Sequence, residues 1–454
     1  MIDRLVIFGG TGDLTGRYLL PGLAALIARG QLPERFQLVA AGREDWGDDR
    51  FRRWAGGWLE REEAGVDADA ARVLVGSSRY RRVDLDDPAG VAASLDGEGP
   101  VALYLALPPA VFPAAVEALQ RAGFPADSQL VLEKPFGEDL ESARELNRLL
   151  AGLVDERHVF RVDHFLAMTT VQNVLGTRLA NRVLEALWNS AHIAEVEIVW
   201  EESLALEGRA AYYDGVGALR DMVQNHLLQV LCLVAMEPPA SLGEQDLRDR
   251  KVDVLRSVRR LRGDDVATRS RRARYRAGRV RDRDIPAYVR EEGVTPGHDT
   301  ETFAEVSLEL DSRRWSGTEF RLRTGKAMGD DRKEVVVHFR PVPDIPLEHS
   351  RGSAANRLRF GLEPEGIALE LLGTGPGLAA GLVPLTLSAE MEAAELPAYG
   401  RILLDVLHGR SALSIRADEA EEAWRVLTPV LEGWSRGLAP LEEYDAGSNG
   451  PPRR

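Results

Sequence analysis

The stretch FGGTGDLTGRYLLPGL, residues 8–23, joins a short apolar run to a helical pattern through a glycine-rich turn. The apolar run, RLVIF at 4–8, is typical of a buried strand, and the apolar residues from 16 to 29 fall on one side of a helix. Gly9 and Gly12 would let the backbone approach a pyrophosphate while the helix N-terminus turns its free N–H groups toward the anion. The stretch therefore predicts a dinucleotide-binding turn. An ordinary tight turn is the alternative, since Thr15 replaces the third glycine of the usual fingerprint.

Further apolar runs alternate with helical patterns up to about residue 160. They are QLVAA, VALYLAL, QLVLEK and HVFRV, and the helical pattern at 139–150 precedes the last of them. Strict alternation of strand and helix indicates a doubly wound parallel sheet of the Rossmann type. We therefore predict that residues 1–160 form a dinucleotide-binding domain.

The pattern changes after residue 160, where longer stretches with a period of two follow one another without a helix between each pair. Examples are IAEVEIVWEE at 193–202, ETFAEVSLELD at 301–311 and EVVVHF at 334–339. This period is typical of a large, mainly antiparallel sheet with flanking helices, and helical spacing returns from 389 to about 436. Residues 161–454 are therefore predicted to form an α+β domain for substrate binding and dimerisation.

The charge balance argues against a nucleic-acid or anionic-membrane partner. The chain has 57 Lys and Arg against 72 Asp and Glu, a net charge of −15. Arginine is dense only in segment 257–284, where Asp is interleaved and there is a single aromatic residue. A solvated face explains this segment better than a polyanion site does.

Compartment and membrane topology can also be predicted. No apolar run approaches the ~20 residues of a bilayer span, and the N-terminus has the pattern of a strand rather than of a signal peptide. Cys232 is the single cysteine, so no internal disulfide can form. These features predict a soluble protein of the reducing cytoplasm.

Two charged residues after the second predicted strand bear on the coenzyme. Arg43 stands where a residue that discriminates between riboses should lie, and a cation there suits the 2′-phosphate of NADP. Glu44 follows directly and would suit a free 2′-hydroxyl. The pattern favours NADP over NAD.

Polar residues at other strand ends and on one helix are candidates for the chemistry. Lys134, in VLEKPFG, should point into the nucleotide cleft, and the Lys134–Pro135 bond is a candidate cis peptide; a surface lysine in a turn is the alternative. Asp163 and His164 follow the strand HVFRV. Asp163 could orient His226 as a general base, although a lone histidine on a helix is more often structural.

Seven motifs in order make a family resemblance specific. They are GGTGDLT, YLALPP, EKPFG, RVDHFL, LRDMVQNHLLQVL, TETF and LRTGKAM, and EEAWRVLTPVLEGW and YDAGSNGP extend the likeness to the C-terminus. Together they resemble glucose-6-phosphate dehydrogenase over essentially the whole chain. The resemblance implies a Rossmann-type domain, a second domain built on a large antiparallel sheet, and a homodimer made through that sheet, with a homotetramer as the other possibility.

The resemblance also implies roles for individual residues. His226 and Asp163 match the catalytic pair, in which the histidine takes the C1 hydroxyl proton while a hydride passes to the nicotinamide, with no metal. Lys134, Glu202 and Asp221 match positions that contact the sugar hydroxyls or the coenzyme. The positions on the coenzyme side are Gly9, Thr11, Gly12, Asp13, Leu14, Arg43 and Lys134.

The predicted pocket for the sugar 6-phosphate departs from the family pattern. The chain keeps His164 and Lys326 of that pocket. It has Phe165 for a Tyr, Met168 for a Lys and Glu363 for a Gln, and Tyr18 replaces an active-site Lys. Two cations are lost and a carboxylate is gained, at ~1.5–3 kcal/mol for each charge-assisted contact. Compensation by Arg332 or Lys333 is the alternative.

The sequence thus predicts an NADP-dependent sugar 1-dehydrogenase of the glucose-6-phosphate dehydrogenase type. It would oxidise C1 of a glucose-like hexopyranose to the δ-lactone, and the group at C6 would be neutral or an amino group. The alternatives are an authentic glucose-6-phosphate dehydrogenase with a rearranged phosphate site and a catalytically silent nucleotide-binding regulator. Retention of His226 and Asp163 argues against the silent regulator.

Overall fold

The computed structural model describes residues 1–454 except 62–64, 296, 344–355, 377–380, 392–393 and 453–454. The chain forms two compact units. The first unit comprises residues 1–167, 239–249 and 394–421. The second unit comprises residues 168–238, 250–393 and 422–454.

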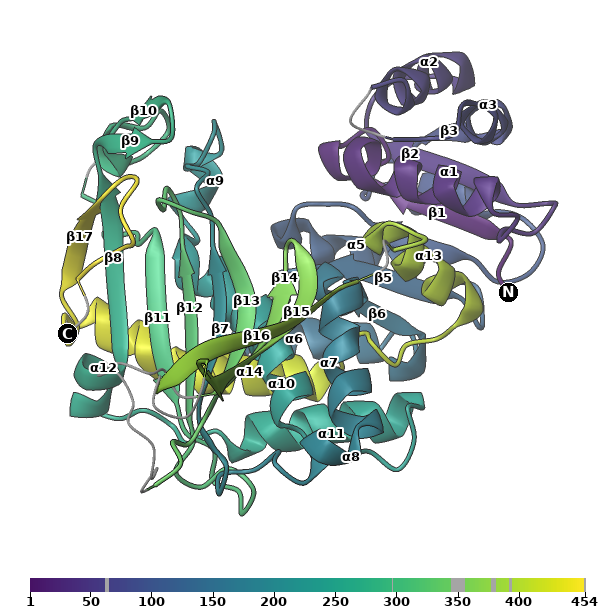
Figure 1. Ribbon diagram of the computed structural model, residues 1–454. Helices are drawn as coiled ribbons and strands as arrows, with labels where there is room; N and C mark the ends of the chain where they lie inside the picture. The colour runs from purple at the N-terminus through teal and green to yellow at the C-terminus, as the bar shows by residue number, and fades with distance from the viewer. Residues whose placement is uncertain (62–64, 296, 344–355, 377–380, 392–393, 453–454) are drawn as a thin grey trace. The chain divides into compact units, whose positions relative to one another are not determined.

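The first unit is built on a six-stranded sheet in the order β3-β2-β1-β4-β5-β6, and every pairing is parallel (Figure 1). The strands are β1 (Arg4–Phe8), β2 (Gln37–Gly42), β3 (Arg79–Arg82), β4 (Ala102–Leu105), β5 (Gln129–Glu133) and β6 (Val159–Val162). The order reverses between β1 and β4. In open parallel sheets, ligands bind at such a switch point, beyond the carboxyl ends of the strands.

Helices between these strands, together with α13 from late in the sequence, belong to the same unit. They are η1 (Thr15–Leu19), α1 (Leu20–Ala28), α2 (Asp48–Leu59), α3 (Ala68–Ser77), α4 (Pro88–Leu95), α5 (Phe112–Ala122), α6 (Leu140–Ala151) and α13 (Ala398–His408). The predicted one-sided pattern is confirmed at Leu19, Leu20, Leu23 and Leu26, which are all fully buried. Helix α13 comes from late in the sequence and packs on α1, where Gly22 lets Gly400 approach closely.

The second unit is built on a nine-stranded sheet in the order β16-β15-β14-β13-β7-β12-β11-β8-β17. Two pairings, β12 with β7 and β17 with β8, are parallel, and the other six are antiparallel. The strands are β7 (Ile193–Glu201), β8 (Ser270–Arg276), β11 (Phe303–Leu308), β12 (Glu319–Gly325), β13 (Arg332–Phe339), β14 (Arg357–Leu362), β15 (Glu365–Thr374), β16 (Leu382–Glu390) and β17 (Leu441–Asp445). A separate hairpin pairs β9 (Gly278–Val280) with β10 (Arg283–Ile285).

Helical segments pack against this sheet. The π-helical segment η6 (Leu219–Leu227) contacts β7, β11 and β12, and α7 (Thr169–Ala180) contacts β14 and β15. Helix α10 (Leu228–Ala235) continues η6 and is buried along its whole length, and the short α8 (Arg182–Glu185), α9 (Ala210–Tyr213) and α12 (Asp264–Arg269) complete the unit. Helices α11 (Glu244–Ser257) and α14 (Ala417–Ser435) each begin in the first unit and end in the second. Among the described residues, no helix is both long and apolar enough to cross a bilayer.

The predicted fold class is confirmed for both sheets. The boundary between residues 160 and 161 stays a prediction. Segments 239–249 and 394–421, which the sequence reading placed in the second domain, cluster with the first unit. The predicted helix from 389 also begins later, because β16 runs to Glu390 and α13 starts at Ala398.

Candidate active site

The glycine turn after β1 has the geometry of a dinucleotide-binding loop. Gly9 has φ +81°, and a Cβ on it would stand 2.1 Å from the carbonyl oxygen of Ala106 after β4. The N–H groups of Gly9 and Gly10 both donate to the carbonyl of Ala41 at 2.9 Å, which anchors the loop on β2. Gly9 therefore meets both a conformational and a spatial requirement for glycine. The loop fits a pyrophosphate, whose close approach needs a backbone without side chains.

Thr15 explains how the loop works without the third glycine. Its side chain is fully buried, and its hydroxyl donates to the carbonyl of Gly9 at 3.1 Å. The close helix packing that the third glycine usually permits falls instead to Gly16, where a Cβ would stand 2.5 Å from the Trp58 ring of α2. Gly16 thus allows the close packing that the third glycine of the fingerprint usually allows, one position further along the chain.

Three further residues predicted on the coenzyme side lie in or beside this turn. Thr11 is half-buried, and Leu14 is half-buried against the hydrophobic core of the unit. Asp13 is exposed and pairs with Arg17 one helical turn on, at 2.6 Å. Their contact with a coenzyme stays a prediction.

Arg43 and Glu44 follow the end of β2. Arg43 is exposed and lies one residue beyond the strand. This is the position from which a side chain can bind the 2′-phosphate of NADP. Glu44 is tied back by Tyr80 of β3, whose hydroxyl lies 3.0 Å from the Glu44 carbonyl oxygen and 3.2 Å from its carboxylate. At the same edge of the sheet, Arg43 is therefore open to solvent, whereas Glu44 is hydrogen-bonded to Tyr80.

Lys134 follows β5 at the same edge, and the Lys134–Pro135 bond, a candidate cis peptide from the sequence, is cis. The residue before it, Glu133, accepts a hydrogen bond from the Tyr104 hydroxyl and another from Tyr399 of α13. Burial raises the pKa of Glu133 to about 7, although the two tyrosine hydroxyls and Lys134 act in the opposite direction. This half-buried carboxylate anchors α13 beside the end of β5.

Asp163 and His164 follow β6. Asp163 is only 3% exposed, and its Oδ1 accepts the backbone N–H of Phe165 at 3.0 Å, which closes the short turn η5 (His164–Ala167). Phe165 is buried, with its ring centroid 5.1 Å from that of His164. Asp163 thus caps the turn with one oxygen. Its predicted partner His226 belongs to the other unit, and their pairing stays a prediction.

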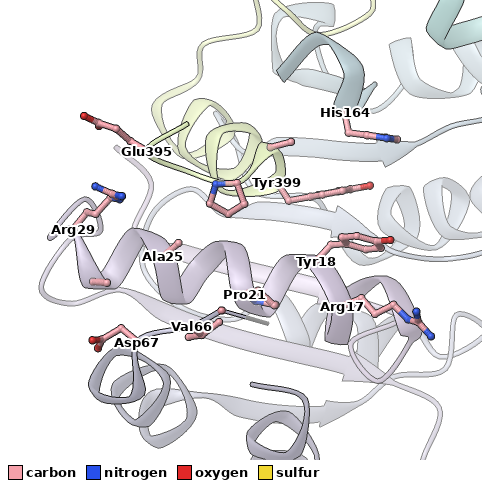
Figure 2. Close-up of a pocket in the computed structure, with 14 residues that line it drawn as sticks. Arg17, Tyr18, Pro21, Ala25, Arg29, Val66, Asp67, His164, Glu395 and Tyr399 are labelled. Carbon is pink, nitrogen blue, oxygen red and sulfur yellow. The ribbon is translucent and has the colours of Figure 1, made fainter. Parts of the chain in front are cut away.

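Three rings line one end of a cavity of about 880 Å³ in the first unit. The Tyr18 ring stacks on Tyr399 at 5.1 Å, and the His164 ring stacks on Tyr399 at 6.0 Å. Figure 2 shows these rings one above another, with Arg29 and Glu395 toward the other end. Position 18, where the family resemblance implies a lysine, thus offers a ring and a hydroxyl.

In the second unit, η6 carries Asp221, Asn225 and His226. His226 is 1% exposed and its backbone N–H donates to the side-chain oxygen of Asn225 at 2.6 Å. Asp221 is half-buried, and its charge contributes, after burial, to raising the pKa of Tyr213. The π-helical turn thus holds the predicted base inside the unit, next to the wholly buried α10.

Glu202 and Lys326 meet because β7 and β12 are parallel neighbours that end at the same edge of the sheet. Glu202 follows β7 and Lys326 follows β12, and the Glu202 N–H donates to the carbonyl of Gly325 at 2.9 Å. The Lys326 ammonium forms an ion pair with the Glu202 carboxylate. Glu202 is therefore the carboxylate partner of Lys326 in the structure, and contact of Lys326 with the sugar stays a prediction.

Lys333 and Glu363 form a second ion pair at this edge. The Lys333 ammonium lies 2.6 Å from the Glu363 carboxylate and 4.8 Å from the centroid of the Trp200 ring. The pair forms because β13 starts beside the end of β14. Arg332, the other suggested compensating cation, is bound by Glu197 and Glu334 instead. Met168 is half-buried and precedes α7.

Sequence reasoning missed several of these partners. It did not find Glu133, Tyr399 or Tyr80, and it did not find the hydroxyl of Tyr213, which is buried without a hydrogen-bond partner among the described residues. Glu133 stands at the end of a buried strand, directly before the predicted Lys134, and that position was a usable signal. No local pattern links it to Tyr399, which lies more than 260 positions away in the chain.

The parallel sheet, its glycine turn and the polar residues at its strand ends define a dinucleotide-dependent oxidoreductase. Comparisons with known proteins give the family. Residues 6–173 match the model "Glucose-6-phosphate dehydrogenase, NAD binding domain", and residues 175–454 match "Glucose-6-phosphate dehydrogenase, C-terminal domain". The chain therefore belongs to the glucose-6-phosphate dehydrogenase family, which confirms the resemblance and NADP as the coenzyme.

Individual relatives agree over the full length. The chain is 37% identical to glucose-6-phosphate 1-dehydrogenase of Zymomonas mobilis, with 99% of this chain and 96% of the relative covered. It is 39% identical to the enzyme of Mycolicibacterium smegmatis, with 98% and 94% covered.

Solved structures show the same similarity. A glucose-6-phosphate dehydrogenase in complex with glucose 6-phosphate matches with a TM-score of 0.89 at 29% identity, covering 99% of this chain and 95% of that one. Glucose-6-phosphate 1-dehydrogenase from Mycobacterium avium matches with a TM-score of 0.85 at 33% identity, covering 99% and 96%. The chain is thus an oxidoreductase built on the glucose-6-phosphate dehydrogenase plan.

Proposed function

We propose that this protein is an NADP-dependent sugar 1-dehydrogenase whose substrate carries a neutral or amino group at C6. It oxidises C1 of a glucose-like hexopyranose to the δ-lactone. The observation that carries the proposal is the Lys333–Glu363 ion pair, because it places a carboxylate against a lysine in the predicted C6 pocket.

The chemistry at C1 needs a base and an orienting partner. His226 takes the proton of the C1 hydroxyl, and Asp163 holds the imidazole in the correct tautomer. Both side chains are almost fully buried, which favours a fixed orientation. When bound, NADP supplies the hydride acceptor at C4 of its nicotinamide. Lys134 and Asp221 then hold sugar hydroxyls or the coenzyme.

The coenzyme would lie along the carboxyl edge of the parallel sheet. Gly9 and Gly12 admit the pyrophosphate, with Thr11, Asp13 and Leu14 around it, and Arg43 binds the 2′-phosphate. The backbone contacts of Gly9 and the exposure of Arg43 support these roles.

The C6 group is argued from the charges in its pocket. Lys326 and Lys333 are each matched by a carboxylate, from Glu202 and Glu363 respectively. Position 168 carries a Met and position 18 a stacked Tyr. A phosphate dianion would therefore have to compete with two carboxylates for two lysines, whereas a hydroxymethyl or an amino group would not. His164 and Phe165 line the same pocket in this proposal.

An authentic glucose-6-phosphate 1-dehydrogenase is the second candidate. Its supporting observation is the position of Lys333 beside Glu363: the Glu363 side chain is 63% exposed, so it can swing away and release the lysine. The names of the relatives agree with this candidate. A catalytically silent regulator is the third, and the retained His226 and Asp163 weigh against it.

A sugar panel separates the three candidates. Reduction of NADP is followed at 340 nm with glucose, 6-amino-6-deoxyglucose and glucose 6-phosphate. Preference for an unphosphorylated sugar supports the proposal, and preference for glucose 6-phosphate supports the second candidate. Absence of turnover with every sugar, with NADP binding intact, supports the regulator.

A homodimer, or a homotetramer built from it, is proposed through the nine-stranded sheet. The edge strand β16 exposes Val383, Leu385 and Leu387, which supports burial against a second copy. Light scattering after size-exclusion chromatography would give the state. A cytoplasmic location also stays a prediction.

A further inference from the structure

The cavity that has His164 at one end continues along the helical segment formed by η1 and α1. One side of its lining is a stripe made by Tyr18, Pro21, Ala25 and Ala28. These residues follow one another at intervals of three and four, so they lie on one side of the helix. At about 1.5 Å per residue, the stripe is roughly 15 Å long. With a volume of about 880 Å³, the cavity is larger than a small group at C6 would fill.

The end of the cavity at Tyr18 is aromatic. The Tyr18 ring stacks on Tyr399 with 28° between the planes, yet Tyr18 remains 48% exposed. Tyr399 is only 9% exposed, and the His164 ring also stacks on it, with 19° between the planes. Tyr399 therefore holds the Tyr18 ring in place while part of that ring stays open to a ligand. Such a ring offers an apolar surface and a hydroxyl together.

The middle of the cavity is lined by small apolar side chains. Pro21, Ala25 and Ala28 lie on the α1 side, and Pro397 and Ala398 lie at the start of α13. These side chains are short and carry no charge. The middle therefore suits a group that is uncharged and has apolar C–H surface.

The other end of the cavity is polar. Arg29 and Glu395 lie there (Figure 2), both are exposed, and neither forms an ion pair or a side-chain hydrogen bond with another residue that the structure describes. Asp67 also lines the cavity, but its carboxylate already accepts the N–H groups of Asp69 and Ala70 at the start of α3. One guanidinium and one carboxylate thus remain to donate to and accept from hydroxyl groups. There is no excess of cations here to favour an anion, and an acyl chain would leave both groups without a partner.

We propose that this cavity binds a sugar residue attached to O6 of the substrate, so that the substrate is a 1→6-linked oligosaccharide oxidised at its reducing end. The inference rests on the proposed function, in which the C6 group lies beside His164 and position 18. Both residues also line the cavity, so a group on O6 extends into it. The C–H faces of the added sugar lie on the Tyr18 ring and the small apolar side chains, and its hydroxyls bond with polar groups of the lining. C1 loses a hydride to NADP and its hydroxyl loses a proton to the base, while the glycosidic bond at O6 stays intact.

The first test compares kcat/KM of the unmodified protein for isomaltose, maltose, glucose and 6-O-octanoylglucose at saturating NADP. Isomaltose carries its second sugar on O6, maltose carries it on O4, and the octanoyl ester carries an acyl chain on O6. We expect isomaltose to exceed glucose by about 10-fold, as for one ring contact and one hydrogen bond, and to exceed maltose and the ester by at least as much. Calorimetry without NADP compares the binding of the same sugars in the absence of turnover.

The second test removes the exposed ring. We expect Tyr18→Ala to lower the ratio of kcat/KM for isomaltose to that for glucose by about 3-fold to 10-fold, and Tyr18→Phe, which keeps the ring, to lower it by less than about 3-fold. Tyr212→Ala, at a tyrosine of α9 that is 45% exposed, is the matched control and should leave the ratio unchanged. Melting temperatures identify a variant that fails to fold, and the sugars tested on the unmodified protein then decide.

The outcomes separate this inference from the proposed function. If glucose is preferred to both isomaltose and glucose 6-phosphate, the proposed function stands and the inference is overturned. The inference is also overturned if Tyr18→Ala leaves the ratio unchanged, or if maltose or the octanoyl ester is preferred to isomaltose. If glucose 6-phosphate is the best substrate, or no sugar is oxidised, the proposed function fails and calorimetry decides on the cavity. Isomaltose binding that is tighter than maltose binding and is weakened by Tyr18→Ala then supports the saccharide site, and its absence overturns it.

Discussion

The Lys333 ammonium lies 2.6 Å from the Glu363 carboxylate. The lysine side chain is only 12% exposed, whereas the carboxylate is 63% exposed, so Glu363 reaches from the surface to cover a largely buried cation. The same lysine stands 4.8 Å from the centroid of the Trp200 ring. The positive charge of Lys333 is therefore paired with the carboxylate of Glu363, at a position where the family resemblance implies a neutral Gln.

Reversing two substitutions should move the specificity toward phosphate. In the double variant Met168→Lys, Glu363→Gln, a cation is gained and the carboxylate on Lys333 is lost. We expect kcat/KM for glucose 6-phosphate relative to glucose to rise by at least ~1.5 kcal/mol in free-energy terms, the low end for one charge-assisted bond. Glu365→Gln, at the first residue of β15, is the control for loss of a nearby carboxylate that does not pair with Lys333. An unchanged ratio in the double variant would argue against the pocket assignment.

Removal of the predicted base should affect turnover and spare the coenzyme. We expect His226→Asn to lower kcat by roughly 10²–10⁴-fold, because the C1 proton loses its acceptor, while the Kd for NADP stays nearly constant. His408→Asn, on the exposed end of α13, is the matched control. A near-normal rate in His226→Asn would rule out the predicted pair with Asp163.

Arg43 should account for the preference for NADP. The unmodified protein should prefer NADP to NAD, and Arg43→Ala should reduce that preference mainly through a higher KM for NADP. Arg53→Ala, at an exposed arginine of α2, controls for loss of charge alone. Equal use of both coenzymes by the unmodified protein would show that Glu44 dominates this edge of the sheet.

The glycine turn gives a stability test with an internal control. We expect Gly9→Ala to abolish NADP binding and lower the melting temperature, because the residue has φ +81° and its Cβ would stand 2.1 Å from the Ala106 oxygen. A Cβ on Gly56 in α2 meets nothing within 4 Å, so Gly56→Ala should stabilise the protein by about 0.5–1 kcal/mol. Thermal unfolding and calorimetry measure both effects. If Gly9→Ala and Gly56→Ala have the same effect on melting temperature and NADP binding, Gly9 is not required for the conformation of the glycine turn.

Glu133 should make stability depend on pH. Its pKa is raised from 4.5 to about 7, so between these values the folded protein holds a proton that the unfolded chain releases. Stability should then fall as pH rises through this window, by up to about 1.4 kcal/mol per pH unit. Glu133→Gln cannot ionise, so denaturant unfolding should show it gaining stability over the parent from pH 5 to pH 8. Glu141→Gln, at an exposed position of α6, is the control and should show no such gain. If the stability difference between Glu133→Gln and the parent is the same at pH 5 and pH 8, the raised pKa of Glu133 is refuted.

Much of the fold follows from local sequence patterns, because strand and helix periodicity reflects which side of each element is buried. The 4–8 strand and the glycine turn were predicted from short stretches, and the Lys134–Pro135 bond was recognised as a candidate cis peptide. The return of segment 394–421 to the first unit was not predicted. It depends on the packing of α13 on α1, which no periodicity reveals.

The candidate site residues could be named from the sequence as predictions, but the ion pairs between them could not. Glu202 and Lys326 were both identified, yet their ion pair depends on the parallel pairing of β7 with β12, strands more than 100 residues apart in the sequence. Lys333 was considered only as a compensating cation, and its capture by Glu363 depends on the register of β13 and β14. Partners of this kind follow from tertiary structure and not from motifs.

The most direct test of the proposed function is kcat/KM of the unmodified protein for glucose, 6-amino-6-deoxyglucose and glucose 6-phosphate at saturating NADP. The account predicts that one of the two sugars without phosphate is the best substrate, because carboxylates already engage both Lys326 and Lys333. If glucose 6-phosphate is the best substrate, the account of the C6 pocket is contradicted, and Lys333, released from Glu363, is the cation to test first.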